Sequence, residues 1–269
     1  MSDSGEPRRS RRLAVLGQWI SINPRLSRAA FAISTVVVLL IILGVARAVG
    51  AIDSRLWGVL ERPLIDGAKN TAIFSLTIIP LGLVLGFFIG WARFSRHPLI
   101  AWPATVYVDF VRGVPPLVMV LFAFFWLPTL TGGGSYEAGL VFAVLALAVH
   151  TSAYQAEIFR AGFQSIARGQ IEAGQAIGLS SPQVMASVVL PQTFRVTLPA
   201  LGNEFALVVK DSSILAIVGA MDLVYWGKQF EQFALTHYGI IEWVMVIWIV
   251  IALLYFVITY LVTQTVGAI

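Results

Sequence analysis

Several ionisable side chains lie in a stretch of the sequence that is otherwise apolar enough for a membrane. In residues 198–226 these include Glu204, Lys210 and Asp211. A charge inside a bilayer is costly and marks either a pathway or an ion pair. On a helix, Asn203 and Lys210 are seven residues apart and share one face, and Glu204 and Asp211 share another. These groups offer complementary charges to a zwitterionic solute. The alternative is that they pair with neighbouring helices and hold a bundle together.

A second polar stripe occurs earlier in the chain. His150, Tyr154 and Glu157 are spaced by four and three residues, so they fall on one side of a helix. They could line a solute pathway, or His150 could be a packing residue and Glu157 could pair with Arg160. The candidate pathway residues are His150, Tyr154, Asn203, Glu204, Lys210, Asp211, Ser212 and Ser213.

A mixed-polarity loop interrupts the apolar sequence between about residues 160 and 195. Residues 170–177 predict a short helix that stops at Gly178. Ser180 and Gln183 match a capping box that starts a second helix, with proline in its first turn. Two short helices at an angle form a compact projection. We interpret this loop as a docking element for a soluble partner.

Nucleotide, metal and thiol chemistry find little support in the sequence. A phosphate cradle needs Gly-Lys followed by Ser or Thr, whereas the sole Gly227-Lys228 pair is followed by Gln. The chain has no cysteine, and His97, His150 and His237 are far apart. We therefore expect no catalytic residue, no metal site and no cofactor in this chain.

The composition sets the class of protein that carries these residues. The 269 residues are 58% hydrophobic and 12% charged, with a mean hydropathy of +0.84. A spanning helix needs about 20 mainly apolar residues. Period-two alternation is absent, so we predict an all-α, polytopic membrane protein with about six transmembrane helices. The apolar regions are residues 29–46, 70–92, 113–136, 138–156, 198–226 and 243–269.

Arginines gather before the first apolar run, which predicts a multi-pass protein with a cytoplasmic N-terminus. We interpret this cluster as a topology anchor rather than a nucleic-acid site. Residues 1–28 are expected to form a cytoplasmic basic tail. Residues 29–66 are expected to hold an extra N-terminal transmembrane helix and an outer linker, and residues 67–265 the main transmembrane domain.

Glycines and prolines predict how the helices pack and bend. Gly82, Gly86 and Gly90 lie four residues apart in a helix expected over about 67–92. Such glycines let another backbone approach closely, either within the bundle or at a subunit interface. The pair Pro115-Pro116 removes two amide donors and should kink or restart a helix. Asp109 and Arg112, three residues apart just before it, could pair.

The loop sequence resembles the permease subunits of ATP-binding-cassette (ABC) importers, in the branch for polar amino acids. That family carries Glu-Ala-Ala, three residues, Gly, nine residues, then Ile-x-Leu-Pro. Here the pattern reads Glu172-Ala173-Gly174, Gly178, then Val188-Val189-Leu190-Pro191. Gly174 replaces an alanine and should weaken the helix by up to about 1 kcal/mol. Further matches are Phe110–Pro115, Ala153–Arg160, Leu190–Gln192, Leu198-Pro199, Asn203-Glu204 and Val209–Ser213.

The resemblance implies a five-helix type I importer core with a cytoplasmic coupling helix. Glu172, Ala173, Gly174, Gly178 and Leu179 would couple it to a partner ATPase. The implied partners are a cytoplasmic ABC ATPase dimer that carries ATP and Mg, a second permease subunit that is identical or paralogous, and an extracytoplasmic amino-acid-binding protein. The implied location is the bacterial inner membrane.

Two other functions remain compatible with the residues alone. The chain could be a secondary transporter that couples ions or protons through Glu204, Lys210 and Asp211. It could also be a non-transporting membrane scaffold whose loop recruits a soluble protein. Transport by the purified chain alone would favour the first, and function without the intramembrane charges would favour the second.

Overall fold

The computed structural model describes residues 54–132, 134–237 and 241–267, which belong to one compact unit, Ser54–Ile269. The expected basic tail and first transmembrane helix lie outside the described residues. Within the described ranges, all regular secondary structure is helical. The helices are α3 (Ser54–Phe94), α4 (Pro98–Gly113), α5 (Pro116–Leu130), α6 (Tyr136–Gln164), α7 (Arg168–Ala176), α8 (Ser181–Val184), the π-helix η1 (Met185–Val189), α9 (Leu190–Asp211), the 3-10 helix η2 (Ser212–Val218), α10 (Leu223–His237) and α11 (Ile241–Gly267).

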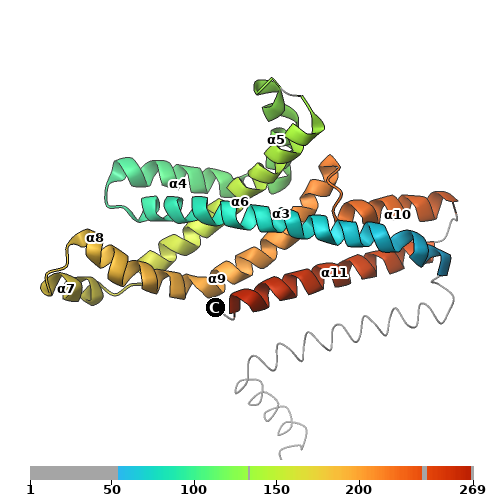
Figure 1. The fold of residues 1–269 in the computed structure, drawn as a ribbon. Helices are drawn as coiled ribbons and strands as arrows, with labels where there is room; N and C mark the ends of the chain where they lie inside the picture. The colour runs from blue at the N-terminus through green and yellow to red at the C-terminus, as the bar shows by residue number, and fades with distance from the viewer. Residues whose placement is uncertain (1–53, 133, 238–240, 268–269) are drawn as a thin grey trace, which may run out of the picture. The chain divides into compact units, whose positions relative to one another are not determined.

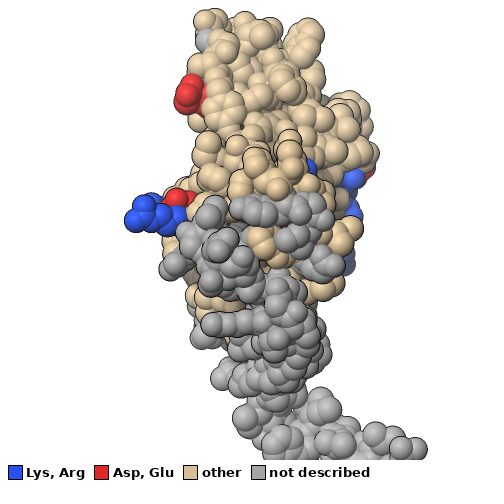
Figure 2. Space-filling model, turned by 90° about the vertical axis from the view of Figure 1, so that its right-hand side faces the viewer, with Lys and Arg blue, Asp and Glu red and all other residues tan. Residues whose placement is uncertain are grey.

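Four helical segments of the described chain are long and apolar enough to cross a membrane. A fifth span is formed if α4 and α5 are counted together, although they are bent by 98° at their junction. Proline begins α5 and Val114 ends α4 in an extended conformation, as the Pro115-Pro116 pair predicts. The segments α3, α9 and α11 run side by side (Figure 1). Uncharged residues dominate the described surface in Figure 2, as expected of a membrane protein.

Three element boundaries differ from the sequence-based expectation. Helix α3 begins at Ser54, so the described part of the expected outer linker is helical. Helix α9 begins at Leu190 rather than near residue 200, and it continues directly from η1. The stretch between the expected apolar regions 198–226 and 243–269 forms helix α10, whose Phe230 and Ala234 are buried.

The closest helix pairing joins α3 to α6 through the glycine stripe. A Cβ atom at Gly86 would lie 2.7 Å from Cβ of Gln155, and one at Gly90 would lie 2.5 Å from the carbonyl oxygen of Ala156. Gly82 is buried against the same helix. The stripe therefore packs within the chain, so the intrachain alternative for these glycines is correct.

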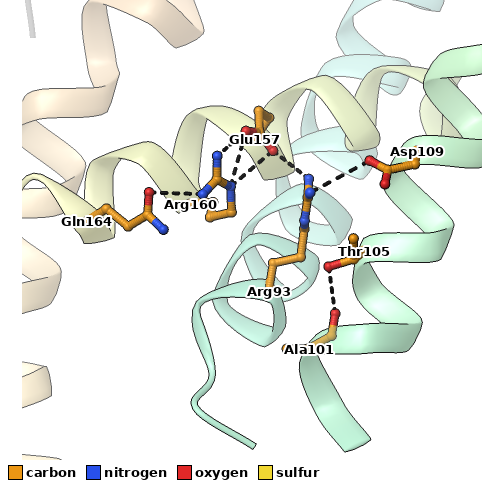
Figure 3. A network of polar contacts seen from close by, with 7 residues as sticks. All are labelled: Arg93, Ala101, Thr105, Asp109, Glu157, Arg160 and Gln164. Carbon is orange, nitrogen blue, oxygen red and sulfur yellow. Dashed lines mark hydrogen bonds and ion pairs between the residues drawn. The ribbon is translucent and has the colours of Figure 1, made fainter. Parts of the chain in front are cut away.

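Ion pairs join α3, α4 and α6 where α3 ends (Figure 3). Glu157 accepts hydrogen bonds from Arg93 and Arg160, and Arg160 also donates to Gln164 at 2.9 Å. Arg93 lies 3.7 Å from the Asp109 carboxylate. The expected Glu157–Arg160 pair is confirmed. Asp109 pairs with Arg93 on α3 rather than with its own helix neighbour.

Buried polar contacts hold the turn before α10. The Asp222 carboxylate accepts from the Tyr225 amide at 2.8 Å and from the Tyr255 hydroxyl at 3.1 Å. The Asn70 side chain donates to the carbonyl oxygen of Met221 at 2.8 Å. Asp222 is fully buried and joins the start of α10 to α11, while the backbone on either side of it is bonded to α3 through Asn70 and Thr71.

We expect Gly86→Val to destabilise the protein markedly, because the added side chain would overlap Gln155 and the backbone of α6. Overpacking of this kind costs about 1–3 kcal/mol or more. Thermal unfolding in detergent, followed by size-exclusion chromatography, measures the effect. The control is Gly113→Ala at the end of α4, where no atom lies within 4 Å of the added Cβ. Equal melting temperatures for the two variants would contradict the packing role.

We expect Glu157→Ala to lower stability more than Asp109→Asn. The first change leaves Arg93, whose side chain is only 13% exposed, without its close carboxylate, and the loss of a hydrogen bond to a charged group costs about 1.5–3 kcal/mol. Asp109 is 65% exposed and more distant, so its loss should cost less than about 1 kcal/mol. The same thermal assay compares them, and the reverse order of stabilities would refute this assignment.

Candidate functional site

Helix α7 lies at one end of the helix bundle (Figure 1). Glu172 and Ala173 are exposed on it, and Ile177, which follows the helix, is 80% exposed. Helix α7 belongs to the loop that we interpret from the sequence as a docking element.

The end of α7 is fixed by a left-handed glycine. Gly178 has φ of +90°, a conformation that residues with a Cβ rarely adopt. The amide of Leu179 donates to the carbonyl oxygen of Gly174 at 3.1 Å, and the amide of Gly178 donates to that of Gln175 at 3.0 Å. These two bonds form a Schellman motif. The predicted helix stop at Gly178 is therefore confirmed.

Gly174 lies where α7 meets α8. A Cβ atom there would be 3.1 Å from Cγ2 of Val184 and 3.7 Å from Cδ1 of Leu179. A larger residue would force Val184 to move, so the glycine allows the close approach of the two short helices. At the start of α8, the amide of Ser180 donates to the side-chain oxygen of Gln183 at 2.8 Å. The predicted glutamine half of the capping box thus forms.

An apolar cluster anchors the loop to the transmembrane helices. Phe159 and Phe163 of α6, Val184 of α8 and Leu201 of α9 are all buried in it, and Ile171 of α7 packs against them. Helices α7 and α8 are therefore packed directly against α6 and α9 through one cluster.

The loop continues into α9 without a break. The π-helix η1 intervenes, and the amide of Leu190 bonds to the carbonyl oxygen of Met185, five residues earlier. The segment Ser181–Val218 is one of the four membrane spans. Single-turn π-segments inside helices are frequent at functional sites. Here the segment connects the loop directly to the ionisable stretch of α9.

Polar side chains connect α6 to α9 within the bundle. The Thr151 hydroxyl donates to the Glu204 carboxylate at 2.9 Å, and the Gln155 side chain donates to the Thr151 hydroxyl at 3.1 Å. The sequence did not lead us to predict a role for Thr151 and Gln155 in this interface. The available signal was their spacing of four residues in an apolar helix, because residues four apart lie on the same side of the helix and face the same neighbouring helix.

His150 and Asp211 are brought together by the fold. Both line a cavity of about 10 Å³ between α3, α6 and α9. His150 also packs against Tyr154, with 5.2 Å between ring centroids, and the guanidinium of Arg112 lies 5.1 Å from the Tyr154 ring. Arg112 therefore makes a cation–π contact, and the expected pair with Asp109 is wrong.

The remaining pathway candidates divide between two faces of α9. Asn203 and Lys210 are exposed, whereas Glu204 and Asp211 are partly covered. Ser212 is buried and its hydroxyl donates to the carbonyl oxygen of Val209 at 2.8 Å, so it serves the helix turn. The predicted pairing therefore holds: Asn203 and Lys210 share one face of α9, and Glu204 and Asp211 share another. Ser213 is half-buried beyond them.

The described part of the chain shows no cluster of side chains that would bind a metal. Within the described ranges, no three His, Asp or Glu side chains gather as metal ligands would. Arg93, Asp109, Glu157 and Arg160 form ion pairs instead, and Glu204 accepts a hydrogen bond from Thr151.

Comparison with known proteins adds several relatives. The chain is 34% identical over 194 residues to the probable glutamine ABC transporter permease protein GlnM of Bacillus subtilis (strain 168), covering 72% of this chain and 85% of that one. It is 33% identical over 196 residues to the glutamine transport system permease protein GlnP of Escherichia coli (strain K12), covering 73% and 86%.

Solved structures share the fold. A crystal structure of an amino acid ABC transporter with histidines matches with a TM-score of 0.67 and 30% identity, over 81% of this chain and 97% of that one. The inward-facing methionine transporter MetNI matches with a TM-score of 0.62 at 18% identity, which supports the fold alone. Residues 79–267 match the family of binding-protein-dependent transport system inner membrane components. The chain, a multi-pass membrane protein with the type I importer fold, belongs to this family.

Proposed function

We propose that the chain is the permease subunit of an ATP-driven amino-acid importer. The observation that carries this proposal is the exposed helix α7, fixed to α6 and α9 through one buried cluster, in a chain of the permease family. The curated relatives named for glutamine and the solved transporter with histidines support amino acids as the solute class. Alternating access would follow from rigid-body movement of the helices.

Glu172, Ala173, Gly174, Gly178 and Leu179 would form the contact with the partner ATPase. Three of them, Glu172, Ala173 and Gly178, are exposed, while Gly174 is buried and Leu179 is half-buried. The exposed residues would therefore touch the partner. Gly174 and Leu179 would set the angle of α7, since they form the helix stop and the contact with α8.

ATP and Mg would bind to the partner, because this chain carries no phosphate cradle in its sequence. We place α7 in the cytoplasm and the N-terminus on the same side, as the arginine distribution favours. The remaining assembly would include an external amino-acid-binding protein and a second permease copy or paralogue in the bacterial inner membrane.

The solute pathway would use the polar interface between α6 and α9. Glu204 faces Thr151, and Asp211 lies beside His150, which gives an acidic side to the bundle. Asn203 and Lys210 would line the surface that faces the second permease, because they are exposed in the single chain. His150, Tyr154, Ser212 and Ser213 would position these groups.

The function is tested by purifying the tagged chain from its native membrane in gentle detergent. We expect an ATPase to co-purify, and Glu172→Lys to abolish its recovery, because the charge reversal lies on the exposed face of α7. Glu137→Lys, an equally exposed reversal at the far end of α6, is the control and should retain the ATPase. Purification of the chain alone, with transport in liposomes driven by an ion gradient, would overturn the proposal.

For the pathway, we expect Lys210→Ala to reduce amino-acid uptake by about tenfold or more without loss of assembly, because the side chain is exposed and forms no ion pair in the described chain. Uptake into proteoliposomes and recovery of the ATPase are measured in parallel. Loss of assembly would instead show that Lys210 holds subunits together. Unchanged uptake would remove it from the pathway.

A further inference from the structure

A second cavity lies between the end of α3 and the loop helices. Its volume is about 680 Å³, within the range of ligand pockets. Residues from α3, α6, α7, α8 and η1 line it. It is distinct from the interface of α6 and α9 described above, and neither the coupling contact nor the solute pathway uses it.

The charge of this pocket has a single sign. Arg93, Arg96 and Arg168 line it, and no Asp or Glu is among its described lining residues. Arg93 is already held by Glu157 and Asp109. Arg96 and Arg168 are exposed and form no ion pair within the described ranges. Two free guanidinium groups at one opening favour an anion, and phosphate suits their geometry.

The pocket lies at the level where membrane spans end. The span of α3 ends at Phe94, the span of α6 ends at Gln164, and the next span begins at Ser181. All three residues line the pocket. Its opening is therefore at the boundary of the bilayer, where lipid headgroups lie.

The rest of the lining is mixed. Ser95, Gln164, Gln175 and Ser181 are polar and uncharged. The apolar lining residues include Phe163, Ile166, Val184 and Met185, of which Phe163 and Val184 belong to the buried cluster that anchors α7. A ligand with an anionic head and a hydrocarbon chain would satisfy both kinds of surface. An inorganic anion would leave the apolar side unused.

We propose that this pocket binds an acidic phospholipid of the adjacent leaflet, with its phosphate at Arg96 and Arg168 and an acyl chain against the apolar residues. Basic pockets between transmembrane helices bind anionic headgroups in this way. The site goes beyond the proposed function and does not depend on which solute is carried.

The lipid would leave the partner's docking face free. Arg168, Ile171 and Gln175 of α7 line the pocket, whereas Glu172 and Ala176 on the neighbouring face are exposed and do not. The headgroup would instead connect Arg96, just beyond α3, to Arg168 at the start of α7. An acidic phospholipid is thus placed to hold the loop against the bundle.

The test is native mass spectrometry of the full-length chain in detergent, titrated with phosphatidylglycerol or with phosphatidylcholine of the same acyl chains. We expect one phosphatidylglycerol to be retained preferentially. Each basic residue near a membrane contributes roughly a fivefold preference for anionic lipid, so Arg96→Gln with Arg168→Gln should weaken binding by at least about tenfold. Arg195→Gln, an exposed arginine of α9 outside the pocket, is the matched control.

Arg96→Lys with Arg168→Lys should restore most of the binding, which separates charge from folding, and size-exclusion profiles verify that all variants fold. Phosphatidylglycerol binding that survives the double glutamine change would overturn the proposal. So would equal retention of the two lipids. Displacement of the lipid by millimolar inorganic phosphate would show a free-phosphate site instead and would also overturn it.

Discussion

The close approach of α3 and α6 is the contact on which the other arrangements depend. Gly86 and Gly90 bring the two backbones together where side chains with a Cβ would clash. This contact sets the rotation of α6 about its axis. Because α6 is fixed in this way, Thr151 faces Glu204 of α9, and Glu157 lies within reach of Arg93 at the other end of the interface. Steric exclusion at the glycines thus determines the geometry of both polar networks.

The position of α7 also depends on the interface between α3 and α6, because side chains next to that interface pack against α7. Phe159 and Phe163 follow the contact residues along α6 and enter the cluster that holds α7 and α8. The ring of Phe87 on α3 lies 5.3 Å from that of Phe159, edge to face. Aromatic pairs of this geometry add to the apolar burial. Helix α7 is therefore connected to the α3–α6 interface through this buried cluster.

Much of this fold could be predicted from residue patterns. Apolar run lengths, the Pro115-Pro116 restart, and the Gly178 stop each depend on local sequence, and each is found in the structure. The long reach of α3 and α9 could not be predicted, because the apolar runs begin only at residues 70 and 198, whereas the helices begin at Ser54 and Leu190. The predicted pair of Asp109 with Arg112 was wrong for a different reason. Spacing along one helix says nothing of a neighbouring helix that offers a better geometry, and only the packed structure brings Arg93 to Asp109.

The π-helix η1 determines how α9 is rotated about its own axis. A π-turn contains one residue more than an α-turn, and each residue turns a helix by about 100°. Because α8, η1 and α9 are continuous, the extra residue between Met185 and Val189 sets which side of α9 points toward α6. Removal of one residue there would leave the loop and the span intact as separate pieces, yet would rotate Glu204 away from Thr151. The extra residue of η1 therefore sets the side of α9 on which Glu204 lies, and the hydrogen bond from Thr151 depends on that setting.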